Sequence, residues 1–209
     1  MFNKKIVFIT GASSGIGASC ATRFAEAHAR LLLCARRLDK LNELANNLKK
    51  QYGIDVLTFE LDVRDYDAVK NALQHLPSDW QNIDVLINNA GLAAGLDPLQ
   101  KANVSDWEDM INTNVKGLLY VTRLILPNMI EKNAGHIINI GSIAGHTIYP
   151  NGAVYCATKH AVKVLTEGLR MDLFGTKVRV TSVDPGAVET NFSIVRFKGD
   201  EKKAAAVYE

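Results

Sequence analysis

Three side chains in the second half of the chain have the types and the spacing needed to move a proton to or from an alcohol oxygen. Tyr155 and Lys159 are four residues apart, so a helix would place them on one face. A phenol has an ordinary pKa of about 10, and a neighbouring cation favours the phenolate and lowers that pKa. Ser142, upstream, has a hydroxyl that could hold a carbinol or carbonyl oxygen. The same Tyr–Lys spacing is also ordinary on a helix surface, so the rest of the chain has to decide between the two interpretations.

Short apolar segments alternate with longer helical patterns, and these elements would have to position the three side chains. The expected strands are residues 5–9, 31–34, 56–60, 85–87, 136–140 and 178–183, and the expected helices are residues 15–27, 38–52, 66–76, 104–132 and 153–174. Regular alternation of strands and helices is typical of a parallel sheet with helices on both faces. The sequence therefore predicts a doubly wound, Rossmann-type α/β fold, with residues 1–209 forming a single domain.

Composition and charge narrow the class of protein. Of the 209 residues, 47% are hydrophobic and 22% are charged, and the formal net charge is +2. These values are typical of a globular protein, and the interspersed charges argue against a nucleic-acid partner or a membrane surface. The three scattered cysteines predict neither a disulfide framework nor a metal site, and they indicate a reducing, cytoplasmic compartment.

A glycine-rich turn lies between the first expected strand and the first expected helix. It contains Gly11, Ser13, Ser14, Gly15, Ile16 and Gly17, with the glycines in a Gly-x-x-x-Gly-x-Gly spacing. Glycines at such a turn let the backbone approach a pyrophosphate, and the helix N-terminus supplies N–H groups and positive potential. The position of the turn therefore predicts a dinucleotide-binding loop.

Further motifs along the chain make a resemblance specific. They are Asn88-Asn89-Ala90-Gly91, Asn114, Ser142, Tyr155, Lys159 and Pro185-Gly186. Together with the glycine turn, their order and spacing resemble the short-chain dehydrogenase/reductase family from residue 4 to about residue 209. Residues 88–95, 106–108 and 195–200 resemble more narrowly its NADP-dependent serine / 3-hydroxy acid dehydrogenase branch.

The end of the second expected strand bears on the choice of cofactor. Dinucleotide folds that select NAD usually place a carboxylate there, which binds the ribose 2′-hydroxyl. This chain has Ala35, Arg36 and Arg37 instead, and guanidinium groups can bind a 2′-phosphate through paired hydrogen bonds. The cofactor is therefore predicted to be NADP(H), with Arg36 as the first contact and Arg37 assisting. A solvated arginine pair at the start of a helix is the alternative.

The resemblance implies roles at the reaction centre. Ser142 would orient the substrate oxygen, and Tyr155 would transfer its proton. Lys159 would lower the tyrosine pKa and contact the nicotinamide ribose. Asn114 would anchor a water in a proton relay and interrupt its helix as a wet kink. A buried Asn114 amide that only ties helix to strand is the alternative.

The resemblance also implies a set of cofactor contacts beyond the glycine turn and the two arginines. They are Asp62, Val63, Asn89, Ala90, Gly91, Tyr155, Lys159, Pro185, Gly186, Val188 and Thr190. Asp62 could equally cap the helix that follows it. At His28 the family usually has a glycine, so a left-handed backbone is expected there.

Substrate recognition is predicted from one arginine. The carboxylate of a 3-hydroxy acid needs a planar cation or several N–H donors. Arg196 lies in residues 191–198, a segment of mixed polarity after the Pro-Gly turn that could fold over the site as a lid. An exposed loop arginine without such a role is the alternative.

The end of the chain bears on assembly. Members of the resembled family generally continue with a seventh strand and its helix, which complete the sheet and a subunit interface. We therefore expect the chain to be incomplete and the protein to form a homo-oligomer, either a dimer or a tetramer. A chain that ends here and is stabilised by a partner is the alternative. A chain that ends at Glu209 would leave the sixth strand as an exposed apolar edge.

The predicted function is an NADP-dependent oxidoreductase acting on a small-molecule substrate. The preferred substrates are small 3-hydroxy acids or hydroxy amino acids, which would give semialdehyde or keto products. A broad carbonyl reductase acting on ketones, or a non-catalytic NADP-binding regulator, are the alternatives. The chain retains Ser142, Tyr155 and Lys159, which a regulator that only binds NADP would not need, so their presence argues against that alternative.

Overall fold

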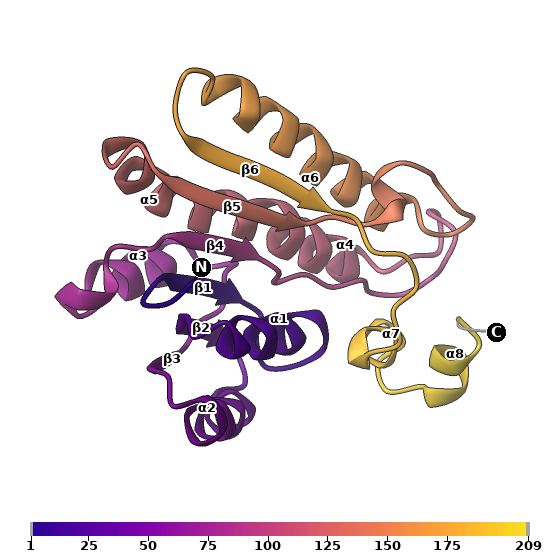
Figure 1. The fold of residues 1–209 in the computed structure, drawn as a ribbon. Helices are drawn as coiled ribbons and strands as arrows, with labels where there is room; N and C mark the ends of the chain where they lie inside the picture. Colours follow the sequence, from indigo (N-terminus) through magenta and orange to yellow (C-terminus); the bar gives the residue numbers. More distant parts are fainter. Residues whose placement is uncertain (1, 208–209) are drawn as a thin grey trace.

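One six-stranded parallel sheet runs through the molecule, in the order β3-β2-β1-β4-β5-β6 (Figure 1). The computed structural model describes residues 2–207. Met1, Tyr208 and Glu209, at the ends of the predicted domain, lie outside the described residues. The strands are β1 (Ile6–Thr10), β2 (Arg30–Ala35), β3 (Val56–Glu60), β4 (Val85–Asn88), β5 (Gly135–Ile140) and β6 (Val178–Val183). The doubly wound fold is confirmed, and each predicted strand is present with ends shifted by at most one residue.

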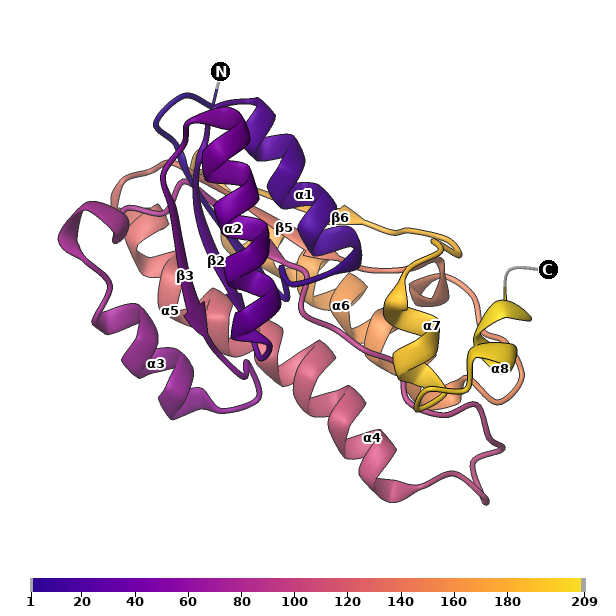
Figure 2. The same cartoon turned by 90° about the horizontal axis from the view of Figure 1, so that it is seen from below.

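Helices cover the sheet because alternate strand residues point to opposite faces. In β1, Phe8 enters one hydrophobic core, whereas Val7 and Ile9 enter the other. The first core also holds residues of α3 (Tyr66–Gln74) and α5 (Leu118–Glu131), and the second holds residues of α1 (Gly15–Glu26) and α2 (Leu38–Tyr52). Figure 2 shows α1 and α2 side by side on their face of the sheet. Burial on both faces explains why β1 is apolar throughout.

The predicted helix over residues 104–132 is present but not uniform. It consists of α4 (Val104–Ile111), a π-helical stretch η2 (Asn112–Gly117) and α5. A π-bulge widens the hydrogen-bonding pattern by one residue and often marks a functional position. The interruption that we expected at Asn114 therefore exists, as a π-helical stretch.

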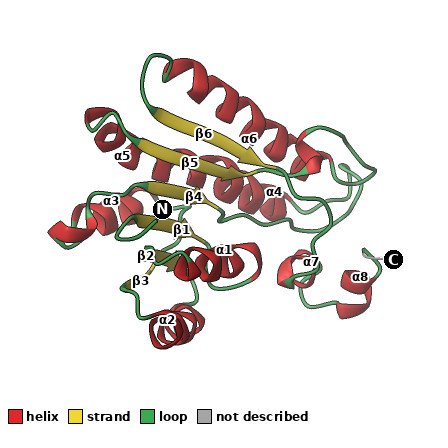
Figure 3. Cartoon of the chain, in the orientation of Figure 1, coloured by secondary structure: helices red, strands yellow, loops and turns green. Residues whose placement is uncertain are grey.

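The remaining elements lie beside the sheet or beyond its ends. Helix α6 (Ala153–Asp172) runs alongside β6, and the short helices α7 (Asn191–Arg196) and α8 (Glu201–Ala205) lie beyond the strand ends (Figures 1 and 3). The 3₁₀ turns are η1 (Ser78–Trp80) and η3 (Ile143–Gly145). Strand β6 forms one edge of the sheet, as predicted. Within residues 2–207, no helix combines the length and the apolar character needed to cross a membrane.

One backbone prediction concerns the end of α1. His28 has a φ of +56°, so the left-handed conformation expected there is confirmed. Its N–H donates to the carbonyl of Ala25 at 2.9 Å, and the N–H of Ala29 donates to Phe24 at 3.0 Å. These bonds close the helix and lead the chain into β2 at Arg30.

Candidate active site

A cavity of about 700 Å³ lies at the carboxyl ends of the strands, beside the point where the chain order reverses between β1 and β4. Ligands of open parallel sheets bind in such a crevice, and cofactor sites commonly measure about 300–1,000 Å³. Of the predicted site residues, all line this cavity except Gly17 and Asn114. The fold therefore brings together side chains from both halves of the chain.

The glycine turn is packed too closely to accept side chains. A Cβ on Gly11 would lie 2.8 Å from the Cα of Ala90, and a Cβ on Gly17 would lie 2.6 Å from the carbonyl oxygen of Gly11. Asn89 fastens the turn, because its side-chain nitrogen donates to the carbonyls of Thr10 at 2.9 Å and Gly11 at 3.1 Å. This backbone leaves a cradle beside the cavity of the kind that a pyrophosphate requires.

The N-terminus of α1 opens onto the same cradle. Ser14 is the N-cap residue, and its side chain makes no capping hydrogen bond. The first N–H groups of a helix have no partner within the helix, and they carry partial positive charge. The geometry therefore fits an anionic phosphate at this point.

The two arginines after β2 have different environments. Arg37 donates hydrogen bonds to the hydroxyl oxygens of Ser13 at 3.2 Å and Ser14 at 2.8 Å. Arg36 is exposed, lines the cavity and lies near enough to the Asp62 carboxylate to stabilise its charge. Arg37 is thus tied to the glycine turn, whereas Arg36 is available to a phosphate. Both positions are compatible with the predicted 2′-phosphate contact.

Asp62 does not cap α3. The N-cap is Asp65, whose carboxylate accepts from the N–H of Ala68 at 3.0 Å, so the capping alternative for Asp62 is wrong. Asp62 instead pairs with Arg64 at 2.6 Å. Burial acts to raise the pKa of Asp62, but its hydrogen bonds with Arg64 outweigh this and lower it. An ionised carboxylate therefore stands at the cavity wall beside Val63.

Tyr155 and Lys159 lie on one face of α6, as their spacing predicts. The Lys159 nitrogen is 5.9 Å from the centre of the Tyr155 ring and donates to the carbonyl of Ile140 at 2.9 Å. Ser142 begins η3 at the end of β5, where its hydroxyl accepts from the N–H of Ala144 at 3.1 Å and also hydrogen-bonds with Tyr155. The three side chains converge on one wall of the cavity. The other interpretation of Tyr155 and Lys159, as ordinary neighbours on a helix surface, is wrong because both side chains are buried.

Burial controls the acidity of this pair. It raises the pKa of Tyr155 to about 12, although the hydrogen bond with Ser142 and the charge of Arg196 act in the opposite direction. It also lowers the pKa of Lys159 to about 8, against the opposing charge of Asp184. The structure thus differs from the expected lowering of the tyrosine pKa, because loss of solvation outweighs the neighbouring charges. The site consequently presents a protonated phenol at neutral pH.

Asn114 uses its side chain to join three elements. Its oxygen accepts from the N–H of Leu92, and its nitrogen donates to the carbonyl of Leu92, both at 2.8 Å. The same nitrogen donates to the Thr158 hydroxyl at 3.0 Å. These bonds tie η2 to the segment after β4 and to α6, as the alternative interpretation of Asn114 requires. Its role in a proton relay stays a prediction.

Arg196 is buried, so the alternative of an exposed loop arginine is wrong. Its guanidinium lies 5.5 Å from the Tyr149 ring centre and 5.8 Å from the Tyr155 ring centre. Its Nε donates to the carbonyl of Gly95 at 3.0 Å. Among residues 2–207, no carboxylate forms an ion pair with it. A buried cation without an anion is costly, so this position favours an anionic ligand.

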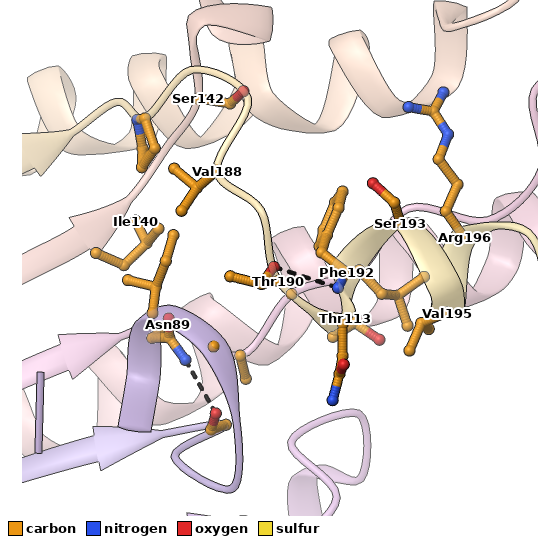
Figure 4. Close-up of a pocket in the computed structure, with 18 of the residues that line it drawn as sticks. Asn89, Thr113, Ile140, Ser142, Val188, Thr190, Phe192, Ser193, Val195 and Arg196 are labelled. Atoms are coloured by element: carbon orange, nitrogen blue, oxygen red, sulfur yellow. Dashed lines mark hydrogen bonds between the residues drawn. The ribbon is translucent and has the colours of Figure 1, made fainter. Parts of the chain in front are cut away.

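Helix α7 forms a wall of the cavity. Figure 4 shows Phe192, Ser193, Val195 and Arg196 projecting from this short helix, with Thr190 at its start. The Thr190 hydroxyl accepts from the N–H of Phe192 at 3.2 Å. Thr190 also faces the glycine turn, where a Cβ on Gly15 would lie 3.4 Å from it. The segment predicted as a lid therefore lines the cavity.

Sequence reasoning missed three residues of the site. The Phe192 ring packs edge-on against Tyr155 with centres 5.8 Å apart, and Tyr149 packs against Arg196. Asp184 bonds the Ser182 hydroxyl at 2.7 Å and its charge acts on Lys159. Phe192 and Asp184 lie next to recognised motifs, which is the signal that could have found them. Tyr149 has no such signal, because its partner Arg196 is distant in sequence.

Comparison with known proteins places the chain among relatives of one kind. Residues 5–201 match the family model described as short chain dehydrogenase. A curated Salmonella typhi protein named NADP-dependent 3-hydroxy acid dehydrogenase YdfG is 52% identical over 205 residues, covering 98% of this chain and 81% of that protein. A Schizosaccharomyces pombe protein named NADP-dependent 3-hydroxy acid dehydrogenase is 47% identical over 205 residues, covering 98% and 79%.

Solved structures agree with these matches. The structure described as the closed form of serine dehydrogenase complexed with NADP+ has a TM-score of 0.92 and 49% identity, covering 98% of this chain and 81% of that chain. The crystal structure of serine dehydrogenase from Escherichia coli has a TM-score of 0.83 and 45% identity, covering 97% and 89%.

Proposed function

The chain belongs to the short-chain dehydrogenase family, and from this premise we propose that it is an NADP(H)-dependent oxidoreductase of small 3-hydroxy acids or hydroxy amino acids. Its products would be the corresponding semialdehydes or keto acids. The observation that carries the substrate assignment is Arg196, a buried guanidinium that has no carboxylate partner in the described chain and lies against Tyr155. A substrate carboxylate would supply the missing anion.

The proposed proton chemistry follows from three buried side chains. Ser142 holds the substrate oxygen, and Tyr155 donates a proton to it in reduction or accepts one in oxidation. Lys159 remains largely charged at neutral pH, because its pKa is about 8, and its charge stabilises the phenolate that reduction leaves behind. Asn114 positions this part of α6 through Thr158. The protein thus handles the proton and orients the carbonyl.

The cofactor assignment rests on the cradle and the two arginines. The close-packed glycine turn and the uncapped N-terminus of α1 fit a pyrophosphate, and Arg36 with Arg37 fits a 2′-phosphate. When bound, the nicotinamide supplies or accepts the hydride. The residues proposed to hold the cofactor are Gly11, Ser13, Ser14, Gly15, Ile16, Gly17, Arg36, Arg37, Asp62, Val63, Asn89, Ala90, Gly91, Tyr155, Lys159, Pro185, Gly186, Val188 and Thr190.

Three further assignments are part of this proposal. Residues 1–209 would act as one domain, located in the cytoplasm and assembled as a homo-oligomer. Exposed apolar side chains on α5 and α6 support the assembly, because isolated domains rarely expose a large apolar surface. They include Ile130, Val164 and Met171, which are 45%, 64% and 79% exposed.

A substrate screen tests the proposal. The purified protein would be assayed by nicotinamide absorbance with NADP+ and serine, 3-hydroxypropionate or 3-hydroxyisobutyrate, and with NADPH and simple ketones. We expect turnover of at least one hydroxy acid and a preference for NADP(H) over NAD(H). Turnover confined to neutral ketones would indicate a broad carbonyl reductase. Cofactor binding without turnover of any compound would indicate a regulator, and either result would reject the substrate assignment.

A further inference from the structure

Residues 106–108 and 195–200 are in contact in the structure, through two side chains that have no role in the proposed proton chemistry. Asp106 lies in the first turn of α4, and Lys198 follows the end of α7. The Lys198 nitrogen is 2.9 Å from one Asp106 carboxylate oxygen and 3.1 Å from the other. Both stretches belong to the segments that resemble one enzyme branch, although they are far apart in the chain. Their contact therefore joins α4 to the segment that carries Arg196.

Among residues 2–207, Lys198 is the ion-pair partner of the Asp106 carboxylate. Its side chain is only 12% exposed, whereas that of Lys198 is 63% exposed. A Cβ on Gly95 would lie 3.2 Å from the carboxylate, so the loop before α4 packs directly against it. A carboxylate held out of water needs a countercharge, and Lys198 provides it from the solvent side.

Gly95 connects this ion pair with Arg196. The N–H of Gly95 donates to the carbonyl of Arg196 at 3.0 Å, and the Nε of Arg196 donates to the carbonyl of Gly95 at 3.0 Å. Gly95 has a φ of +67°, a conformation that favours glycine. Asp106 thus supports Gly95 from one side, and Gly95 holds both the backbone and the side chain of Arg196.

We propose that Asp106 and Lys198 are positioning residues, which hold the end of α7 so that Arg196 faces the substrate carboxylate. The proposal rests on the proposed function of Arg196 in hydroxy-acid binding. The ion pair fixes the end of the helix, and the two Gly95 bonds fix the arginine within it. Neither Asp106 nor Lys198 touches the reacting atoms. Loss of either would let the guanidinium move away from Tyr155 and weaken carboxylate binding.

Kinetics of single and double variants test the proposal. Lys198→Met and Asp106→Asn should each raise KM for a 3-hydroxy acid about tenfold, because a small misplacement of a binding group has large effects. For a neutral alcohol or ketone, KM should stay within about twofold. The KM of the double variant should not exceed the higher KM of the two single variants, because both substitutions break the same ion pair. Lys198→Arg should retain low KM by keeping the charge.

The matched control is Glu108→Gln, on the same helix as Asp106. Glu108 is exposed, does not pair with Lys198 and does not lie against Gly95, so the KM of this variant should stay at the wild-type value. An unchanged KM in Lys198→Met would overturn the proposal. So would an equal rise in KM for neutral substrates, or a rise in the double variant equal to the sum of the two single effects on binding free energy. Lys198 is mostly exposed, so its variant tests the ion pair even if Asp106→Asn fails to fold.

Limited proteolysis tests the same contact without turnover. Trypsin cleavage after Arg196, followed by mass spectrometry, should be several-fold faster in Asp106→Asn than in Glu108→Gln or wild type. Equal cleavage rates would overturn the positioning role. Wild-type protein that oxidises no hydroxy acid would instead overturn the proposed function, so the two failures are distinguishable.

Discussion

The Arg196 guanidinium lies 5.8 Å from the centre of the Tyr155 ring. Lys159 lies at a similar distance, 5.9 Å, so the ring has two cations beside it. One cation comes from the same helix, and the other comes from α7, which lines the cavity. This arrangement links the proposed proton donor to the proposed carboxylate-binding group, and it motivates the predictions that follow.

Tyr155→Phe should remove proton transfer and leave the fold intact. The phenylalanine ring keeps the edge-on contact with Phe192 and lacks only the hydroxyl that bonds Ser142. Loss of a general acid/base typically costs about 10²–10⁴-fold in rate, and we expect a fall in kcat of this size. Turnover should be compared with NADPH binding by fluorescence and with Tm, both of which should change little. A variant with near wild-type kcat would reject the role of Tyr155.

Arg196→Ala should weaken the binding of hydroxy acids. A charged hydrogen bond to a carboxylate is worth about 1.5–3 kcal/mol, so KM should rise about tenfold or more. Arg196→Lys keeps the charge but loses the planar pair of donors, and its KM should be intermediate. The measurement is saturation kinetics with 3-hydroxypropionate beside a neutral ketone. An unchanged KM for the hydroxy acid would end the assignment.

Arg36→Ala and Arg37→Ala should separate two roles in cofactor binding. Arg36 is exposed and lines the cavity, so its loss should weaken NADPH binding about tenfold and leave NADH binding nearly unchanged. Arg37 bonds Ser13 and Ser14, so its loss should weaken both cofactors by disordering the turn. Dissociation constants from fluorescence titration would show this pattern. Equal effects of Arg36→Ala on NADPH and NADH would contradict it.

Lys159→Met should stabilise the free protein while abolishing activity. The pKa of Lys159 falls from 10.5 to about 8, which corresponds to a cost of about 3 kcal/mol for the buried charge at neutral pH. The variant also loses the hydrogen bond to the carbonyl of Ile140, and this loss lowers its stability by about 1 kcal/mol. We therefore expect a net gain of about 2 kcal/mol in the free energy of unfolding. Denaturant unfolding at pH 7 would measure it.

The same variant has a pH signature. Because the folded-state pKa of Lys159 is depressed, the folded protein binds fewer protons than the unfolded chain between about pH 8 and pH 10.5. The stability contribution of this group therefore rises through that window. The advantage of Lys159→Met should shrink as the pH increases from about 8 towards 10. A constant difference in stability across that range would contradict the buried ammonium.

The local features of the fold were predictable because they depend on neighbouring residues. Short runs such as residues 56–60 and 178–183 give strands with the predicted bounds, since both are rich in β-branched residues and flanked by turns. The glycine turn was recognisable because only glycine fits where Cβ atoms would collide, as at Gly11 and Gly17. The left-handed backbone at His28 was implied by the resemblance, because the family usually has a glycine at this helix end.

The tertiary structure decided what depends on distant pairs and on burial. The partners of Arg196 and Asp106 come from remote segments, and no periodicity in the chain predicts Tyr149 beside Arg196 or Lys198 beside Asp106. Asp62 and Asp65 both precede α3, and the folded chain uses Asp65 as the N-cap. The acidity of Tyr155 depends on how many atoms exclude water from it, and only the folded chain determines that number. Local chemistry in the sequence therefore specified the strands, the turn and the candidate residues, whereas long-range packing and desolvation decided how those residues act on one another.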